Sequence, residues 1–321
     1  MARKSIKTAA NCGVNAVKFQ NFKTEDFLTD RTITYTYKSQ GEEVTEPLYD
    51  ICKRSEFKQE WLGPLKELCD SLDVEFMSTP TSEEGIMDLV NAGVKVLKNG
   101  SDYLTHIPLL EFMGGTGLQV IISTGMAYKE DVEDAVNAVK KAGNGNIILL
   151  HCVSNYPTLD ENVNLNRMTT LRKRYNLPVG FSDHTLGWSA ASHAVTIGAC
   201  VIEKHFTFDR NLTGPDHWFS ADPDELQVLV EEVRRAEKQL GSADISPAVS
   251  EMVVREKYRL GLVAARDMRS GHALRKEDLV FRKPCTGFLP KDRDRILGRK
   301  LARDLEAGRP IRSEDILGEE N

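Results

Sequence analysis

The stretch VGFSDHTLGWSAASHAVTIGACVIEKH, residues 179–205, contains two short apolar runs, and each run leads into a histidine. The runs cover residues 179–182 and 200–204, and the segment between them has room for one helix. A strand, a helix and a second strand in this order are typical of parallel strands joined by a crossover. We therefore expect His184 and His205, which are 21 residues apart, at the same end of two neighbouring strands.

Five further apolar runs precede this stretch and are separated by amphipathic segments with helical spacing. They cover residues 16–20, 74–78, 94–98, 119–123 and 147–151. Strands that alternate with helices predict a parallel sheet buried on both faces, and thus an α/β protein. Seven strands are one fewer than a (β/α)8 TIM barrel requires. Because a helix-like stretch, residues 2–12, leads directly into the first run, we expect that the first barrel strand is missing from this chain.

The pattern changes after residue 240. Residues 241–260 are expected to form a linker with a short helix at 251–259, and residues 1–240 the barrel domain. From residue 261 to 321, short β-like pieces such as 262–264, 278–281 and 309–311 alternate with glycine turns. A module of about sixty residues has a thin core and often depends on a partner. The sequence thus predicts a barrel followed by a small β-rich domain.

Charge and composition exclude several classes of protein. The net charge of −6 argues against nucleic acid as the main partner. Residues 255–321 carry +5 and residues 1–254 carry −11, so the two parts favour docking on each other, within one chain or between chains. The alternative is that these are unevenly charged solvated surfaces. The sequence contains no apolar run long enough to span a membrane, and its first residues lack the apolar core of a signal peptide. Its six cysteines include no CxxC pair. We expect a soluble cytoplasmic protein.

Polar residues follow the predicted strands where the carboxyl ends of a barrel gather, an edge that we call the mouth. They are Lys18, Gln20, Ser78, Thr79, Lys98, Ser101, Ser123, Thr124, His151, Ser154, Ser182, His184, Lys204 and His205. Lysine charges and hydroxyl donors together favour an anion such as a phosphate group. For any single hydroxyl, the alternative is turn or cap chemistry.

The paired histidines indicate a metal site. Two imidazoles with room for water and a substrate oxygen suit a divalent ion such as Mn²⁺ or Zn²⁺. His217 is a third candidate, either as a ligand or as a substrate contact. Asp183 and Glu203 precede the histidines, and we expect them to point elsewhere and to support ligands or packing.

Several motifs occur in an order that resembles a known family. They are AVKFQ (16–20), STP (78–80), STGM (123–126), HC (151–152) with YP (156–157), FSDHT (181–185), EKHFT (203–207) and GPDH (214–217). Together they resemble the N-acetylneuraminate (sialic acid) synthase family over nearly the whole chain. Members of that family join a (β/α)8 barrel to a C-terminal antifreeze-like (SAF) domain with a β-clip fold.

The resemblance implies condensation of phosphoenolpyruvate with an N-acetylated mannosamine-type sugar, giving a nonulosonic acid and phosphate. It implies a divalent metal, usually Mn²⁺, with Mg²⁺ or Co²⁺ as alternatives, and a domain-swapped homodimer. By similarity, His184 and His205 bind the metal, and these two with Lys98 are the catalytic residues. Phosphoenolpyruvate is implied to contact Lys18, Thr79, Lys98, Ser101, Ser123 and Ser182. The acceptor sugar is implied to contact Gln20, Tyr156 and Asp216.

The chain departs from the family pattern at three places. It has no Ala-Glu-Ile-Gly-type segment with the glutamate of the first strand. Tyr103 stands where a second acidic side chain is often found. Lys283 stands where the family has an arginine that reaches the active site of the partner subunit, and Arg282 is adjacent to it. Lysine keeps the positive charge but cannot make the two parallel hydrogen bonds of an arginine side chain.

Three alternatives stay open. The acceptor is N-acetylmannosamine, a diacetamido precursor of legionaminic acid or a precursor of pseudaminic acid. A non-catalytic or truncated relic that retains ligand binding is a rival to the enzyme. A second rival is a phosphoenolpyruvate-condensing barrel that acts on a phosphorylated sugar, although such enzymes generally lack a SAF-like tail.

Overall fold

The computed structural model describes residues 1–318. It divides into two units, residues 1–241 and the part from residue 242 onward. Each unit has its own buried core and is described by itself. Within residues 1–318, no helix combines the length and the apolar composition that crossing a membrane requires.

The first unit is built on seven parallel strands in the order β1-β4-β5-β6-β7-β8-β9. Their bounds are β1 (Ala16–Asn21), β4 (Glu75–Pro80), β5 (Val96–Asn99), β6 (Gln119–Ser123), β7 (Ile147–Cys152), β8 (Val179–Asp183) and β9 (Ile202–Lys204). The sheet is curled, and a contact between its two edge strands shows this. The Lys18 Nζ atom on β1 lies 3.2 Å from the Glu203 Oε1 atom on β9. All seven predicted strands are confirmed, and the architecture is the (β/α) barrel type.

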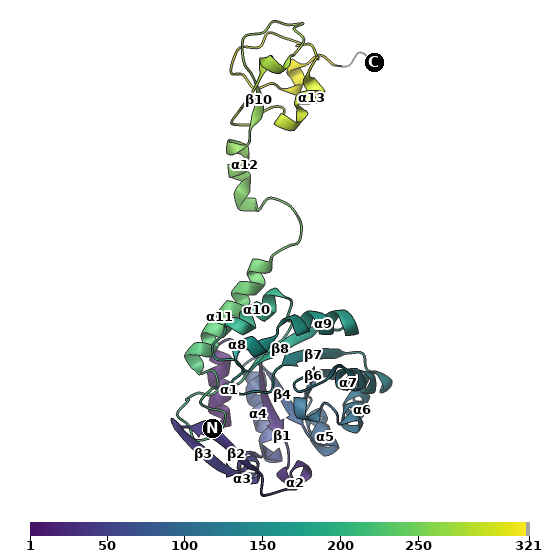
Figure 1. Ribbon diagram of the computed structural model, residues 1–321, viewed down its shortest axis with the longest axis vertical. Helices are drawn as coiled ribbons and strands as arrows, with labels where there is room; N and C mark the ends of the chain where they lie inside the picture. The colour runs from purple at the N-terminus through teal and green to yellow at the C-terminus, as the bar shows by residue number, and fades with distance from the viewer. Residues whose placement is uncertain (319–321) are drawn as a thin grey trace. The chain divides into compact units, whose positions relative to one another are not determined.

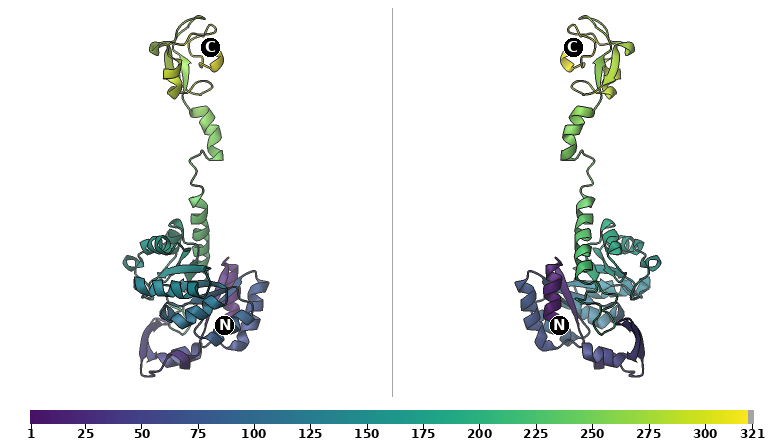
Figure 2. Two further views of the ribbon diagram at one scale, coloured as in Figure 1. Left: turned by 90° about the vertical axis from the view of Figure 1, so that its right-hand side faces the viewer. Right: turned by 90° about the vertical axis from the view of Figure 1, so that its left-hand side faces the viewer.

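The helices of this unit lie outside the sheet, and most of them pack against it (Figure 1, Figure 2). Their bounds are α1 (Ala2–Asn11), α2 (Thr24–Phe27), α3 (Leu48–Ser55), α4 (Leu62–Ser71), α5 (Glu83–Asn91), α6 (Ile107–Gly115), α7 (Lys129–Lys141), α8 (Asp160–Val163), α9 (Asn166–Tyr175), α10 (Ser189–Thr196) and α11 (Pro223–Leu240). In α7, Val132, Val136 and Val139 recur at helical spacing and are buried. Acidic residues in its first turn and lysines in its last turn complement the helix dipole.

Helices α1 and α11 lie beside the two edge strands. Helix α1 packs against α4, β1 and α11, as Figure 1 shows. Ala9 of α1 joins Ala221 and Leu226 in a small apolar cluster. Apolar side chains from both ends of the unit therefore seal the side of the barrel where the edge strands face each other.

A β-hairpin after β1 was not predicted from the sequence. Strands β2 (Thr34–Ser39) and β3 (Glu42–Pro47) are antiparallel, and Gln40 and Gly41 form the turn with φ of 54° and 87°. Positive φ at both central residues is typical of a type I′ hairpin turn. The Ser39 hydroxyl accepts a hydrogen bond from the Gly214 amide (3.3 Å), so the hairpin holds the loop that follows β9.

The second unit contains α12 (Met252–Tyr258), β10 (Gly261–Ala264), β11 (Leu279–Arg282) and α13 (Arg293–Ile296). Strands β10 and β11 pair antiparallel. The piece at 309–311 does not form a strand of its own, but it pairs with β10 through an antiparallel bridge between Pro310 and Val263. Nine buried apolar residues form the core: Leu262, Ala264, Met268, Leu274, Leu279, Ile296, Leu301, Leu305 and Ile311.

The second unit repeats itself at an interval of 37 residues. Buried Asp278 accepts hydrogen bonds from the Arg266 Nε atom (2.7 Å) and the Arg275 amide (2.9 Å). Buried Asp315 accepts from the Arg303 Nε atom (2.5 Å) and the Arg312 amide (2.7 Å). Each aspartate therefore binds the amide of one turn and the side chain of one arginine, and the two sets of contacts are equivalent.

Candidate active site

Lys98 lies at the end of β5 and is buried, with 4% of its surface exposed. Its Nζ atom donates to the Ser123 hydroxyl (2.5 Å) and to the Asn99 carbonyl (3.1 Å). Burial lowers the pKa of this ammonium, while the charge of Glu203 acts in the opposite direction. The structure therefore brings together Lys98 and Ser123, as predicted for an anion site.

Glu203 connects the two predicted lysines. Its Oε1 atom lies 3.2 Å from the Lys18 Nζ atom, and its Oε2 atom lies 3.5 Å from the Lys98 Nζ atom. Burial alone would raise the pKa of this carboxyl, but the charges of Lys98 and Lys18 outweigh burial and lower it to about 2. The expectation that Glu203 points away from the site is wrong. It precedes His205 by two residues, and side chains two apart along a strand share a face.

Ser101 lies against the loop after β6. Its hydroxyl accepts a hydrogen bond from the Gly125 amide (3.0 Å) and lies 3.2 Å from the Cys152 Sγ atom. A Cβ atom on Gly125 would collide with Ser154, would lie 2.7 Å from the Ser101 Oγ atom and would touch Cys152. Only glycine leaves room for three polar side chains to converge on this backbone.

His184 and His205 follow β8 and β9 and lie side by side, with ring centroids 5.4 Å apart. The Nδ1–H group of His184 donates to the Val153 carbonyl (2.7 Å), so Nε2 carries the free lone pair. The Ser182 hydroxyl lies 3.4 Å from that Nε2 atom. Burial lowers the pKa of both rings, to about 3 for His205. Both imidazoles are therefore neutral, as metal ligands must be.

This donor set fits a divalent cation that completes its coordination with water and substrate oxygens. Within residues 1–318, no group of three or more His, Cys, Asp or Glu side chains is arranged to hold a metal. His217 therefore does not join the pair as a third ligand. Its Nδ1 atom lies 2.8 Å from the Thr207 hydroxyl instead. Two fixed neutral imidazoles with open positions are typical of a metal that also binds substrate.

Aromatic and polar residues surround the histidine pair. The Tyr156 ring lies 4.4 Å from the His184 ring and 5.5 Å from the His205 ring, between centroids. The Asp216 Oδ2 atom lies 3.6 Å from the His205 Nδ1 atom. These contacts bring Tyr156 and Asp216 to the histidines from two different loops.

The remaining predicted residues are distributed as follows. Gln20 is exposed near the end of β1, and its register partner on β4, Thr79, is buried. Lys283 belongs to the second unit, where its Nζ atom lies 5.3 Å from the centre of the Tyr258 ring. Lys204 is paired with buried Asp183 (2.9 Å) and lies on the opposite face of the strands from Glu203.

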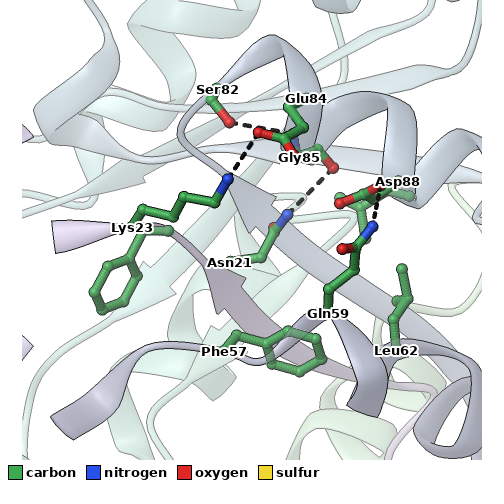
Figure 3. Close-up of a pocket in the computed structure, with 11 residues that line it drawn as sticks. Asn21, Lys23, Phe57, Gln59, Leu62, Ser82, Glu84, Gly85 and Asp88 are labelled. Carbon is green, nitrogen blue, oxygen red and sulfur yellow. Dashed lines mark hydrogen bonds and ion pairs between the residues drawn. The ribbon is translucent and has the colours of Figure 1, made fainter. Parts of the chain in front are cut away.

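A separate hollow of about 90 Å³ lies between the end of β1 and the start of α5 (Figure 3). Its polar groups are paired with one another: Asn21 donates to the Gly85 carbonyl, Lys23 binds Glu84 (2.8 Å) and Gln59 donates to Asp88 (2.8 Å). Because these groups satisfy one another, we place the candidate site at the mouth and not in this hollow.

Comparison with known proteins gives two family matches. A NeuB family model matches residues 5–244, and a SAF domain model matches residues 260–317. The chain is 40% identical over 305 residues to the N,N'-diacetyllegionaminic acid synthase of Legionella pneumophila, covering 94% of this chain and 86% of the relative. It is 30% identical over 302 residues to a pseudaminic acid synthase of Campylobacter jejuni, covering 94% of this chain and 87% of that protein.

A solved structure agrees with the sequence matches. The N-acetylneuraminic acid (sialic acid) synthetase of Leptospira borgpetersenii, in complex with citrate, is similar with a TM-score of 0.70 and 36% identity. The similarity covers 79% of this chain and 84% of that chain. Because the NeuB match spans nearly the whole barrel unit and the relatives match along most of their length, this chain belongs to the NeuB family and carries a SAF domain at its C-terminal end.

Proposed function

We propose that this protein condenses phosphoenolpyruvate with an N-acetylated mannosamine-type sugar to give a nonulosonic acid and phosphate. The proposal rests on one observation: two lysines and two neutral histidines lie close together at the mouth. Lys18 and Lys98 form a cationic pocket, and the neutral pair His184 and His205 lies on strands next to it. The names of the acid synthases to which the chain is similar support the same reaction.

The donor is assigned to the lysine pocket. Lys18 and Lys98 would neutralise the phosphate and carboxylate groups of phosphoenolpyruvate, and Ser101, Ser123, Ser182 and Thr79 would provide hydroxyl donors. Oriented charges in a buried pocket stabilise the negative charge that moves onto the departing phosphate. Lys98 is the most buried of these cations and is assigned the largest share of that effect.

The histidine pair is assigned to a divalent cation, Mn²⁺ first, with Mg²⁺ and Co²⁺ as alternatives. When bound, such an ion supplies Lewis acidity that makes an aldehyde carbon more electrophilic. The Val153 carbonyl holds His184 in the tautomer that leaves Nε2 unprotonated. Tyr156 packs against both rings and limits the access of water to them.

The acceptor sugar is assigned to Gln20, Tyr156 and Asp216, which would orient its open-chain aldehyde toward the donor. The C3 carbon of phosphoenolpyruvate forms a bond to the aldehyde carbon, and water adds at C2. The bond between C2 and the phosphate oxygen then breaks, which leaves a 2-keto acid and inorganic phosphate. Holding both substrates in one mouth removes much of the entropic barrier to this step.

Among acceptors, we propose the diacetamido sugar that leads to legionaminic acid. The relative with 40% identity carries that name, whereas the pseudaminic acid synthase is 30% identical. N-Acetylmannosamine and the pseudaminic acid precursor are the alternatives.

We further propose that two chains assemble, with the SAF domain of one chain over the mouth of the other. The exposed apolar residues Met126, Tyr128, Leu159, Leu186 and Trp188 follow β6, β7 and β8 at that mouth. The SAF domain is basic, the barrel is acidic, and Lys283 with Arg282 would add positive charge near the donor. All six cysteines are free, which fits the cytoplasmic location that we propose.

The proposed function is tested by incubating the protein with Mn²⁺, phosphoenolpyruvate and each of the three sugars. Phosphate release together with a nonulosonic acid in the mass spectrum is expected, fastest with the diacetamido sugar. Binding of phosphoenolpyruvate without release with any sugar would favour the non-catalytic relic. Release only with a phosphorylated sugar would favour the other type of condensing barrel.

A further inference from the structure

Both lysines that we assign to the donor are already paired with one carboxylate. The Glu203 side chain lies between them, at 3.2 Å from Lys18 and 3.5 Å from Lys98. Within residues 1–318, it is the only carboxylate within ion-pair distance of either lysine. The other partners of the Lys98 ammonium, Ser123 and the Asn99 carbonyl, are neutral. Glu203 is therefore the counter-ion of the whole pocket.

An anion that enters this pocket competes with Glu203. The carboxylate is tethered to β9 and faces the lysines at a high effective concentration, so a small anion with one charged group replaces it poorly. A donor that carries a phosphate and a carboxylate engages both lysines at once. After the reaction the phosphate and the carboxylate belong to separate molecules. Each product then competes with Glu203 through a single anionic group.

We propose that Glu203 is an internal competitor anion that makes the pocket selective for donors with two anionic groups and promotes the release of inorganic phosphate. This inference rests on the proposed function for the identity of the donor. It assigns a binding and release role to a residue whose position at the site was not expected from the sequence.

The test is a calorimetric titration of inorganic phosphate, which needs no turnover. Glu203→Gln removes the charge and keeps the size of the side chain, so phosphate should bind at least tenfold more tightly than to the unaltered protein. Equal or weaker binding would overturn the proposal, because it would show that Glu203 only positions the lysines. Glu75→Gln is the matched control, since Glu75 pairs with Lys95 (3.0 Å) at the opposite end of the strands and should leave phosphate affinity unchanged.

Glu203→Asp provides a second variant in case the glutamine variant does not fold. It keeps the charge but withdraws the carboxylate by one methylene, so phosphate affinity should rise at least threefold. An unchanged or reduced affinity would contradict the proposal. In steady state, Glu203→Gln should also show stronger product inhibition by phosphate. If phosphate binding changes as expected and no sugar is turned over, the proposed reaction fails and the competitor role stands.

Discussion

The Nδ1–H group of His184 donates a hydrogen bond to the Val153 carbonyl at 2.7 Å, and this contact decides which ring nitrogen is available to a ligand. Val153 follows β7 and His184 follows β8, so the register of two neighbouring strands sets the tautomer. The geometry leaves Nε2 unprotonated beside His205, with a lone pair that is available to a metal ion. Backbone contacts of this type are typical of histidines that bind metals.

Replacing either histidine should abolish metal binding with little effect on folding. We expect His184→Ala and His205→Ala to lower kcat/KM by at least about 100-fold, because even partners that only orient a metal ligand account for losses of 10- to 100-fold. The electron paramagnetic resonance signal of Mn²⁺ measures binding directly. His193→Ala on the exposed face of α10 is the control, and an equal loss there would refute the assignment.

Lys98→Met should weaken the donor site selectively. The substitution keeps most of the side-chain volume, removes the charge and leaves Glu203 with Lys18 alone. We expect kcat to fall by about 100-fold, the usual cost of losing one charge-stabilising donor, and the KM for phosphoenolpyruvate to rise. Lys95→Met, three residues earlier and exposed, should change neither constant. A normal KM for the donor in the Lys98 variant would contradict its role.

Gly125→Ala should displace Ser101 without unfolding the barrel. The added Cβ atom would lie 2.7 Å from the Ser101 Oγ atom and would also collide with Ser154. Donor affinity should fall at least tenfold, measured by titration with phosphoenolpyruvate. Gly145→Ala is the control, because a Cβ atom there meets nothing within 4 Å. Unchanged donor affinity in the Gly125 variant would show that Ser101 does not contact the donor.

Asp278 should make the stability of the SAF domain depend on pH. Burial raises the pKa of this carboxyl, but its hydrogen bonds with His272, the Arg275 amide and Arg266 outweigh burial and lower it. A lowered pKa means that the stabilisation is complete above the unfolded pKa of about 4 and is lost as the pH falls through the lower folded value. Chemical denaturation of the full chain should therefore show that the SAF domain unfolds at a lower denaturant concentration below about pH 4 than at pH 7.

Asp278→Asn should cost about 2 kcal/mol of unfolding free energy at pH 7, because it removes the charge from the buried acceptor of the hydrogen bonds from Arg266 and the Arg275 amide. The variant should also show a flatter pH dependence below pH 4. Asp304→Asn, which affects an exposed ion pair with Arg269, should have a much smaller effect. Equal losses from both variants would show that burial of Asp278 is not what makes it important.

Much of the barrel could be predicted because its strands are apolar runs separated by amphipathic helices. The hairpin β2–β3 was missed although its signal is present: residues 34–39 and 42–47 flank a Gln-Gly turn. Those strands are rich in exposed threonine, lysine and glutamate side chains, so they lack the apolar runs that marked the others. The repeat around Asp278 and Asp315 was also missed, because its interval of 37 residues is only meaningful once both aspartates are seen to bind equivalent groups.

The ends of the predicted strands indicated which residues lie at the site, but not which of them form ion pairs or hydrogen bonds with one another. Lys98 with Ser123, and His184 with His205, are brought together as expected. Glu203 was misplaced because its position was judged against its immediate neighbours instead of against His205, two residues later. The contact of Glu203 with Lys18 joins the first and last strands of the sheet, and no local pattern in the sequence encodes a contact that depends on how far the sheet curls.

The most direct measurement is an anomalous difference map from crystals soaked with Mn²⁺ and phosphoenolpyruvate. We predict one strong peak within coordinating distance of His184 Nε2 and His205, with density for the donor phosphate against Lys18 and Lys98. A map without a peak at the histidine pair, or with the donor bound elsewhere, would contradict the assignment of these residues to a metal-assisted condensation.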